Sequence, residues 1–170
     1  MNKLAKSTAF LILGVFFFLG NSSYTKADNS ANQILYCPQE YIDICNEMQE
    51  KYGVSSSLLI AMIQCESSCR PDVVSNEGAI GLMQIHPINI PPGKDATDPR
   101  TNIELGTKVL LEWKDKATDE DILLALALYE GWGNTAYKKY KGEQWNYDCF
   151  NYAQKVLDLT LQIDKIRYGQ

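Results

Sequence analysis

The chain has 170 residues, of which 45% are hydrophobic, and 21 acidic against 16 basic side chains give a formal net charge of −5 at pH 7. This length is sufficient for one domain with a substantial core. An excess of acidic residues disfavours a long polyanion as partner, so we expect no binding to nucleic acid.

The first 27 residues have the layout of a secretory signal peptide. Lys3 and Lys6 precede a short apolar run at 8–19, and 25–27 (Thr-Lys-Ala) resembles a small-x-small cleavage site. The run is shorter than the roughly 20 apolar residues of a bilayer-spanning helix; the alternative is an uncleaved membrane anchor. We therefore expect a signal peptide at 1–27, a short N-terminal segment at 28–37 and one domain at 38–170. The exported protein would be periplasmic, associated with the cell wall or extracellular.

All cysteines follow the predicted cleavage site, at Cys37, Cys45, Cys65, Cys69 and Cys149. In an oxidising compartment they predict one or two disulfides and a leftover thiol, with the connectivity open. One pair is disfavoured. If a helix begins at Cys37, the rise of about 1.5 Å per residue puts Cys45 about 12 Å away, beyond the roughly 7 Å limit between bridged Cα atoms.

The first half of the domain has the spacing of helices separated by a long segment of turns. Apolar residues at helical spacing predict a first helix from Pro38 to Tyr52, which Gly53 ends. The serines at 55–57 offer an N-cap to a second helix at 58–67. Proline and glycine then break the pattern between 68 and 99, and a third helix is expected at 101–116, with Val109 and Trp113 on its apolar face.

The second half is predicted to be helical as well. Thr118 opens a fourth helix, with Asp121 completing a weak capping box. Residues 122–129 are apolar on nearly every side, which is typical of a central helix. Gly131 is expected to end this helix. A short helix near 135–140 and a last one at about 148–166 follow. The fold class is mostly α, with at most a small β-hairpin, around 81–90.

A carboxylate lies on the inward face of the second predicted helix. Leu59, Met62, Ile63 and Glu66 share that face by their spacing. Glutamate is rarely buried without a partner, and burial raises the pKa of a carboxyl group. A carboxyl group that stays protonated near neutral pH can act as a general acid. The alternative, an exposed glutamate without a role at a fraying helix end, is favoured by spacing alone.

The residues after Glu66 change that balance. Gly78 and Gly81 permit tight turns or close approach of a ligand, and 82–85 (Leu-Met-Gln-Ile) add apolar surface with one amide. With Ser67, Pro71, Ser75, Ala79 and Pro87, they closely resemble the catalytic motif of soluble lytic transglycosylases, a group that includes goose-type lysozymes. Further family elements follow in order, namely Asp98-Pro99 with Asn102-Ile103 and Gly106, then Ala127-Leu128-Tyr129, then Tyr152 with Lys155-Val156-Leu157.

The resemblance, which covers about 38–160, implies a lysozyme-like α+β fold and cleavage of the β-1,4 bond between N-acetylmuramic acid and N-acetylglucosamine in peptidoglycan. It implies neither cofactor nor metal. Glu66 would be the catalytic acid and base, and the product would carry a 1,6-anhydromuramic end. The candidate substrate-binding residues are Ser75, Met83, Gln84, His86, Tyr129, Glu130 and Tyr152.

The chain departs from the family after Tyr129, where Glu130-Gly131-Trp132-Gly133 stands in place of the usual Asn-Ala-Gly. Glu130 could activate water as a second carboxylate, so that the enzyme hydrolyses the same bond as a lysozyme does. Alternatively, Glu130 faces solvent. Trp132 could stack on a sugar or pack in the core.

Other functions remain as alternatives. A metal site of Cys65, Cys69 and His86 lacks the paired C-x2-C elements of structural zinc sites, and a Cys65 nucleophile is disfavoured in an apolar helix. A non-catalytic module for wall binding or a secretion scaffold is a further alternative. We expect a monomer whose partner is the peptidoglycan strand, and hypothesise a second partner in an envelope-spanning secretion or conjugation machine.

Overall fold

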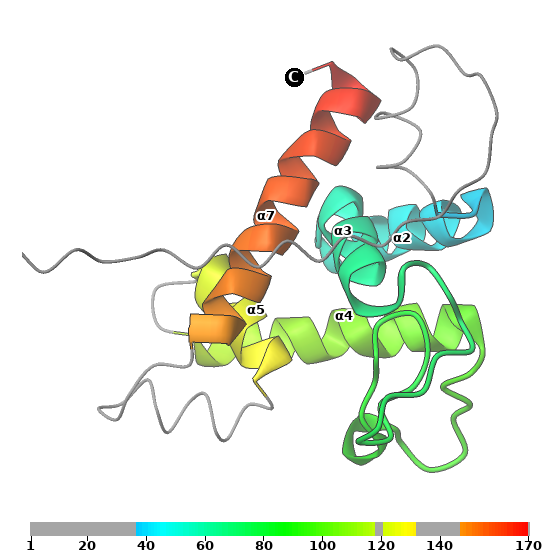
Figure 1. Cartoon of the computed structure of the whole chain (residues 1–170). Coiled ribbons are helices and arrows are strands. Elements are labelled where there is room, and N and C mark those ends of the chain that lie inside the picture. Colours follow the sequence, from blue (N-terminus) through cyan, green and yellow to red (C-terminus); the bar gives the residue numbers. More distant parts are fainter. Residues whose placement is uncertain (1–36, 118–120, 132–146, 170) are drawn as a thin grey trace, which may run out of the picture.

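The computed structural model describes residues 37–117, 121–131 and 147–169 (Figure 1). The helices of these ranges are α2 (Gln39–Tyr52), α3 (Ser56–Ser67), the 3-10 helix η1 (Pro87–Asn89), α4 (Pro99–Lys116), α5 (Ile122–Glu130) and α7 (Tyr147–Tyr168). None of them is long and apolar enough to cross a membrane. The predicted signal peptide at 1–27, the short helix at 135–140, Thr118 and Trp132 lie outside the described residues.

Side-chain caps determine where three of the helices begin. The Ser55 hydroxyl accepts a hydrogen bond from the backbone N–H of Leu58 at the start of α3. Asp98 caps α4 in the same way, and Pro99 takes the first helical position, so α4 begins two residues before the predicted start. Asp121 is itself the N-cap of α5, because its carboxylate accepts from the N–H groups of Leu123 and Leu124.

Two helices form the centre of the fold. α3 packs against α2 and α7, and α5 packs against α4 and α7. Figure 1 shows the long α7 running from α5 past α3. Both central helices are buried on nearly every side, with Ile60 and Met62 of α3 and Leu126 of α5 fully enclosed. The prediction of a mostly helical fold with a central helix at 122–129 is confirmed.

The segment between α3 and α4 contains isolated β-bridges, Val74 with Ile80 and Ile80 with Ile85, in place of a regular hairpin at 81–90. Gly78, Gly81 and Gln84 have positive φ angles, of 83°, 77° and 46°. These residues close successive tight turns, so no extended run remains long enough to form a strand.

A disulfide joins Cys37 at the start of α2 to Cys69 just after α3, with Cα atoms 5.3 Å apart. Cys45 is fully buried in α2 and takes no part in it, as the helical rise predicts. Because Cys69 is oxidised in this bridge, the metal site of Cys65, Cys69 and His86 is wrong.

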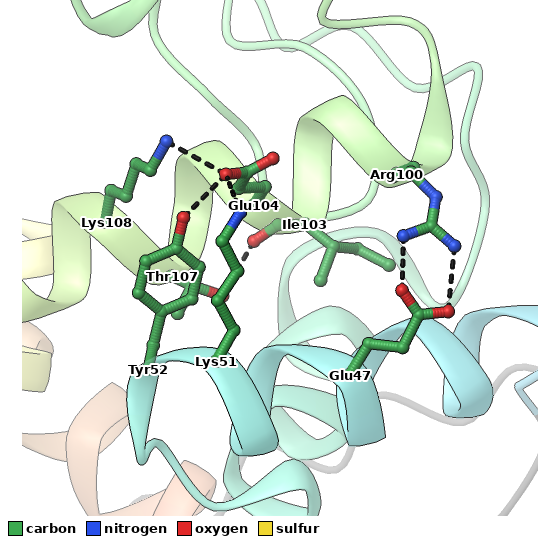
Figure 2. A network of polar contacts seen from close by, with 8 residues as sticks. All are labelled: Glu47, Lys51, Tyr52, Arg100, Ile103, Glu104, Thr107 and Lys108. Carbon is green, nitrogen blue, oxygen red and sulfur yellow. Dashed lines mark hydrogen bonds and ion pairs between the residues drawn. The ribbon is translucent and has the colours of Figure 1, made fainter.

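A polar network closes the interface between α2 and α4 (Figure 2). Its charged and hydroxyl-bearing members are Glu47, Lys51 and Tyr52 on α2, and Arg100, Glu104 and Lys108 on α4. The Tyr52 hydroxyl donates to Glu104 at 2.6 Å. This hydrogen bond, together with the nearby lysines, lowers the pKa of Glu104 to about 2. The network holds the register of α4 along α2.

Candidate active site

A cavity of about 600 Å³ opens where the end of α3 meets the segment before α4, the middle of α4, the end of α5 and the start of α7. Its lining residues are Cys65, Glu66, Ser75, Glu77, Ala79, Gln84, Ile85, His86, Ile88, Asn89, Val109, Trp113, Tyr129, Glu130 and Tyr152. Seven of the eight candidate residues named from the sequence line this cavity, and Met83 is the exception.

Glu66 lies in the last turn of α3, where Ser68 and Cys69 take positive φ angles and end the helix. Burial, the dominant cause, raises the pKa of Glu66 to about 7, the charge of Glu130 adds to this effect, and a hydrogen bond from Tyr152 opposes it. The alternative of an exposed glutamate at a fraying end is wrong. Near neutral pH a substantial fraction of such a carboxyl group is protonated, so it can donate a proton as a general acid.

Two tyrosines from different helices line the cavity together with Glu66. The Tyr152 hydroxyl of α7 donates to Oε1 of Glu66 at 2.5 Å, and the Tyr129 hydroxyl of α5 donates to the backbone oxygen of Met83 at 2.8 Å. Burial, with the charge of Glu66 second, raises the pKa of both phenols well above the ordinary value. Both therefore remain protonated at neutral pH.

Asn102 of α4 fixes the segment that forms one wall of the cavity. Its Nδ2 donates to the backbone oxygens of Ile80 and Ala96, and its Oδ1 accepts from the N–H of Met83, each at 2.8 Å. A side chain at Gly81 would overlap the Asn102 amide, so glycine is required there for close approach as well as for its positive φ.

Ser75 and Gln84 line the cavity and also hold its wall. The Ser75 Oγ accepts from the N–H groups of Glu77 and Ala79, at 3.3 and 3.0 Å. Nε2 of Gln84 donates to the backbone oxygens of Val73 and Gly81, at 3.2 and 2.9 Å. Both residues are thus placed in the wall, with part of their hydrogen-bonding capacity used by the turn itself.

Met83 differs from the expectation that it lines the cleft. Its side chain is fully buried and packs so closely against Gly106 of α4 that any Cβ there would overlap it. The turn at 81–84 directs Gln84 toward the cavity and Met83 into the core, so Met83 contributes its backbone oxygen to the site through Tyr129.

His86 and Glu130 both line the cavity. His86 caps η1, with Nδ1 3.5 Å from the N–H of Ile88. Glu130 is exposed as a residue, yet partial burial of its carboxyl group and the charge of Glu77 raise its pKa. Glu130 therefore borders the cavity, while part of its side chain remains exposed to solvent.

The sequence pattern did not identify Trp113 as a cavity residue. Trp113 lines the cavity beside Val109, and Nζ of Lys116 lies 4.5 Å from its ring centroid. The helical spacing placed both residues on the apolar face of α4. That signal could not separate the part of the face in the core from the part that borders the cavity.

Known proteins share this sequence pattern and this fold. Residues 43–151 match the family described as the transglycosylase SLT domain. The membrane-bound lytic murein transglycosylase C of Edwardsiella ictaluri is 37% identical over 84 residues, which cover 42% of this chain and 23% of that protein. The match thus spans about a quarter of the relative.

Two solved structures share the fold. The 70 kDa soluble lytic transglycosylase of Escherichia coli has a TM-score of 0.63 at 23% identity, covering 77% of this chain and 25% of that one. An inactive glutamate-to-glutamine mutant of the lytic transglycosylase Slt of Pseudomonas aeruginosa has a TM-score of 0.67 at 20% identity. The match covers 82% of this chain and 26% of that one. The family match, which spans more than half of the sequence, shows that this chain belongs to the transglycosylase SLT domain family.

Proposed function

We propose that the chain is an exported peptidoglycan lytic transglycosylase with Glu66 as its acid and base. The observation that carries the proposal is a buried carboxyl group with a pKa of about 7, held by Tyr152 at the edge of a cavity large enough for sugar rings. The names of the relatives, lytic murein transglycosylases, support the same substrate. A signal peptide at 1–27, a catalytic domain at 38–170 and an envelope location belong to this proposal.

The proposed reaction uses one carboxyl group twice. Protonated Glu66 gives its proton to the glycosidic oxygen, and the bond to C1 of the muramic residue breaks through an oxocarbenium-like state. The resulting carboxylate then takes the proton of the muramic 6-hydroxyl as that oxygen bonds to C1. The products are a 1,6-anhydromuramic end and a free 4-hydroxyl on the leaving sugar, so no water is consumed.

The cavity walls suggest how a glycan strand would be held. Ser75, Gln84 and His86 supply polar groups on one side, and Trp113 with Val109 forms an apolar wall from α4. A sugar ring has polar edges and an apolar face, and an aromatic side chain fits the apolar face. Tyr129 keeps an oxygen lone pair for an acetamido N–H, since its own proton is donated to Met83.

A specific observation favours one alternative reaction. Glu130 lines the same cavity as Glu66, so its carboxylate could activate a water molecule and release an ordinary reducing end. Its raised pKa makes it a weaker candidate, because less of the basic form is present at a given pH.

The test compares wild type, Glu66→Gln and the surface control Glu47→Gln on purified peptidoglycan, with mass spectrometry of the released fragments. We expect anhydro fragments from wild type and Glu47→Gln, and none from Glu66→Gln. Equal release by wild type and Glu66→Gln would refute the catalytic role of Glu66. No release by any of the three chains would indicate a non-catalytic wall-binding or scaffold module. Hydrated ends alone would favour the lysozyme-type reaction. The partnership with an envelope secretion or conjugation machine, and the monomeric state, remain proposals that a pull-down and a sedimentation measurement would test.

A further inference from the structure

The helix that carries Glu66 ends in a left-handed turn built from two residues with side chains. α2 ends at Gly53, whose positive φ of 71° is readily adopted by a glycine. α3 instead ends at Ser68 and Cys69, with φ angles of 53° and 59°. A Cβ makes left-handed backbone unfavourable, so two such residues in succession persist only where their surroundings hold them.

The backbone hydrogen bonds of this turn stay within the end of α3. The N–H of Ser68 donates to the carbonyl oxygen of Gln64 at 3.1 Å, and the N–H of Cys69 donates to that of Ile63 at 3.4 Å. The second bond is longer than the usual distance of about 2.7–3.2 Å. Because donors and acceptors all belong to 63–69, these bonds would be lost together if the last turn of the helix unwound.

The disulfide links this turn covalently to a second helix. It joins Cys69 to Cys37, which lies two residues before α2, with 5.3 Å between the Cα atoms. Both cysteines are buried, and α2 packs against α3. The bridge therefore holds the backbone of Cys69 from outside α3, which the local hydrogen bonds cannot do.

Glu66 lies three residues before Cys69, so its place at the cavity depends on the last turn of α3. Unwinding of that turn would expose the carboxyl group and separate it from the Tyr152 hydroxyl, which donates to it at 2.5 Å. Burial is the dominant influence on the pKa of Glu66, so exposure would lower that pKa although the loss of the Tyr152 donor acts in the other direction. The other described titratable groups that line the cavity are Cys65 on α3, Glu77 and His86 before α4, Tyr129 and Glu130 on α5, and Tyr152 on α7.

We propose that the Cys37–Cys69 bridge is a positioning element for Glu66, because it holds Ser68 and Cys69 in their left-handed turn and so keeps the last turn of α3 wound. The catalytic meaning of this arrangement rests on the proposed function. The arrangement itself determines the proton affinity of Glu66, which can be measured without turnover.

The first test follows the carboxyl carbon of Glu66 by NMR in chains labelled with ¹³C-glutamate, with the signal assigned by its loss in Glu66→Gln. The bridge is removed by Cys37→Ala together with Cys69→Ala, since alanine suits the buried sites. We expect the pKa of Glu66 to fall from its wild-type value of about 7 by about one unit or more. An unchanged pKa would overturn the proposal.

Cys45→Ala is the matched control. Cys45 is a fully buried free cysteine of α2, so this variant removes a core thiol without touching the turn or the bridge. We expect the pKa of Glu66 to stay within about 0.3 unit of wild type. A fall as large as in the chain without the bridge would overturn the proposal, since it would mean that a loss of packing in α2 is sufficient.

The second test adds Ser68→Gly to the chain without the bridge. Ser68 is exposed, so glycine there removes no core packing, and it adopts the positive φ without a steric penalty. If the bridge acts by holding the left-handed turn, this glycine should recover at least about half of the lost shift in the pKa of Glu66. No recovery would overturn the proposed role of the turn.

Circular dichroism establishes that each variant is folded. If the alanine pair does not fold, Cys37→Ala alone, which keeps the Cys69 side chain, replaces it with the same expectations. If no variant without the bridge folds, with or without Ser68→Gly, the positioning role is overturned, because the bridge then serves the stability of the whole domain.

These titrations separate the two proposals. A chain that titrates as expected but releases no fragments from peptidoglycan would refute the proposed function only. A chain that cleaves peptidoglycan, and in which Glu66 titrates alike with and without the bridge, would refute the positioning role only.

Discussion

The buried carboxyl group of Glu66 should make the folded chain less stable as the pH rises. Its pKa is raised from 4.5 to about 7. Below pH 4.5 the folded and unfolded chains are both protonated, so there is no penalty. Between these two values the unfolded chain releases its proton while the folded chain keeps it, and stability falls. Above pH 7 the full penalty applies, which a shift of this size makes about 3 kcal/mol.

Glu66→Gln removes that penalty while keeping a side chain of the same shape that can accept from Tyr152. Between pH 5 and pH 8.5, the free energy of unfolding of Glu66→Gln relative to wild type should therefore rise by about 2.5 kcal/mol. For a domain of this size, 1 kcal/mol corresponds to roughly 2–4 °C in melting temperature. Urea unfolding followed by circular dichroism at both pH values measures the difference directly.

Glu104→Gln is the matched control, because the same substitution there should have the opposite sign. The Tyr52 hydroxyl, then Lys108 and Lys51, lower the pKa of Glu104 to about 2. Its carboxylate therefore stabilises the fold above pH 4.5, and this contribution is lost as the pH falls toward 2. A Glu66→Gln chain whose advantage over wild type does not increase between pH 5 and pH 8.5 would refute the burial argument for Glu66.

Further predictions concern the turn, the disulfide and the reaction product. Gly81→Ala should lower the free energy of unfolding by about 2 kcal/mol more than Gly93→Ala, because both glycines have positive φ but only Gly81 lies against another side chain; equal urea midpoints for the two variants would contradict this. Reduction of the Cys37–Cys69 bridge, which spans a sequence separation of 32, should cost roughly 3–4 kcal/mol in the same measurement, and an unchanged midpoint in reductant would argue against it. Glu130→Gln should still release anhydro fragments. If the wild type releases fragments with hydrated ends and Glu130→Gln releases no fragments, Glu130 would instead be the base that activates water.

The helices could be predicted because their signals are local. Proline, glycine and capping residues mark the ends of α2, α3 and α4 within about two residues, and the spacing of Leu59, Met62, Ile63 and Glu66 identified the carboxyl group on the inward face. The cap of α5 was missed in detail. The sequence predicted that Thr118 opens the helix and that Asp121 completes a capping box. In the structure Asp121 is itself the N-cap, and only its hydrogen bonds distinguish the two arrangements.

The wall of the cavity was harder to predict because distant residues determine it. Met83 and Gln84 are neighbours in an apolar run, yet one is buried and the other faces the cavity, since the positive φ of Gln84 and the hydrogen bond from Met83 to Asn102, 19 residues away, set the turn. The pairing of Cys37 with Cys69 likewise depends on how α2 packs on α3. Trp113 remained unassigned because one helix face borders both the core and the cavity.

The interlocking of Gly81 with Asn102, and of Met83 with Gly106, has a consequence for how such a sequence can change over time. Each pair joins the turn before η1 to α4, and in each pair one partner has no side chain because the other occupies that space. A larger residue at either glycine would be tolerated only after its partner had become smaller, so single steps pass through a less stable intermediate. The two motif segments should therefore vary jointly, and a homologue that replaces one glycine should carry a compensating change across the interface.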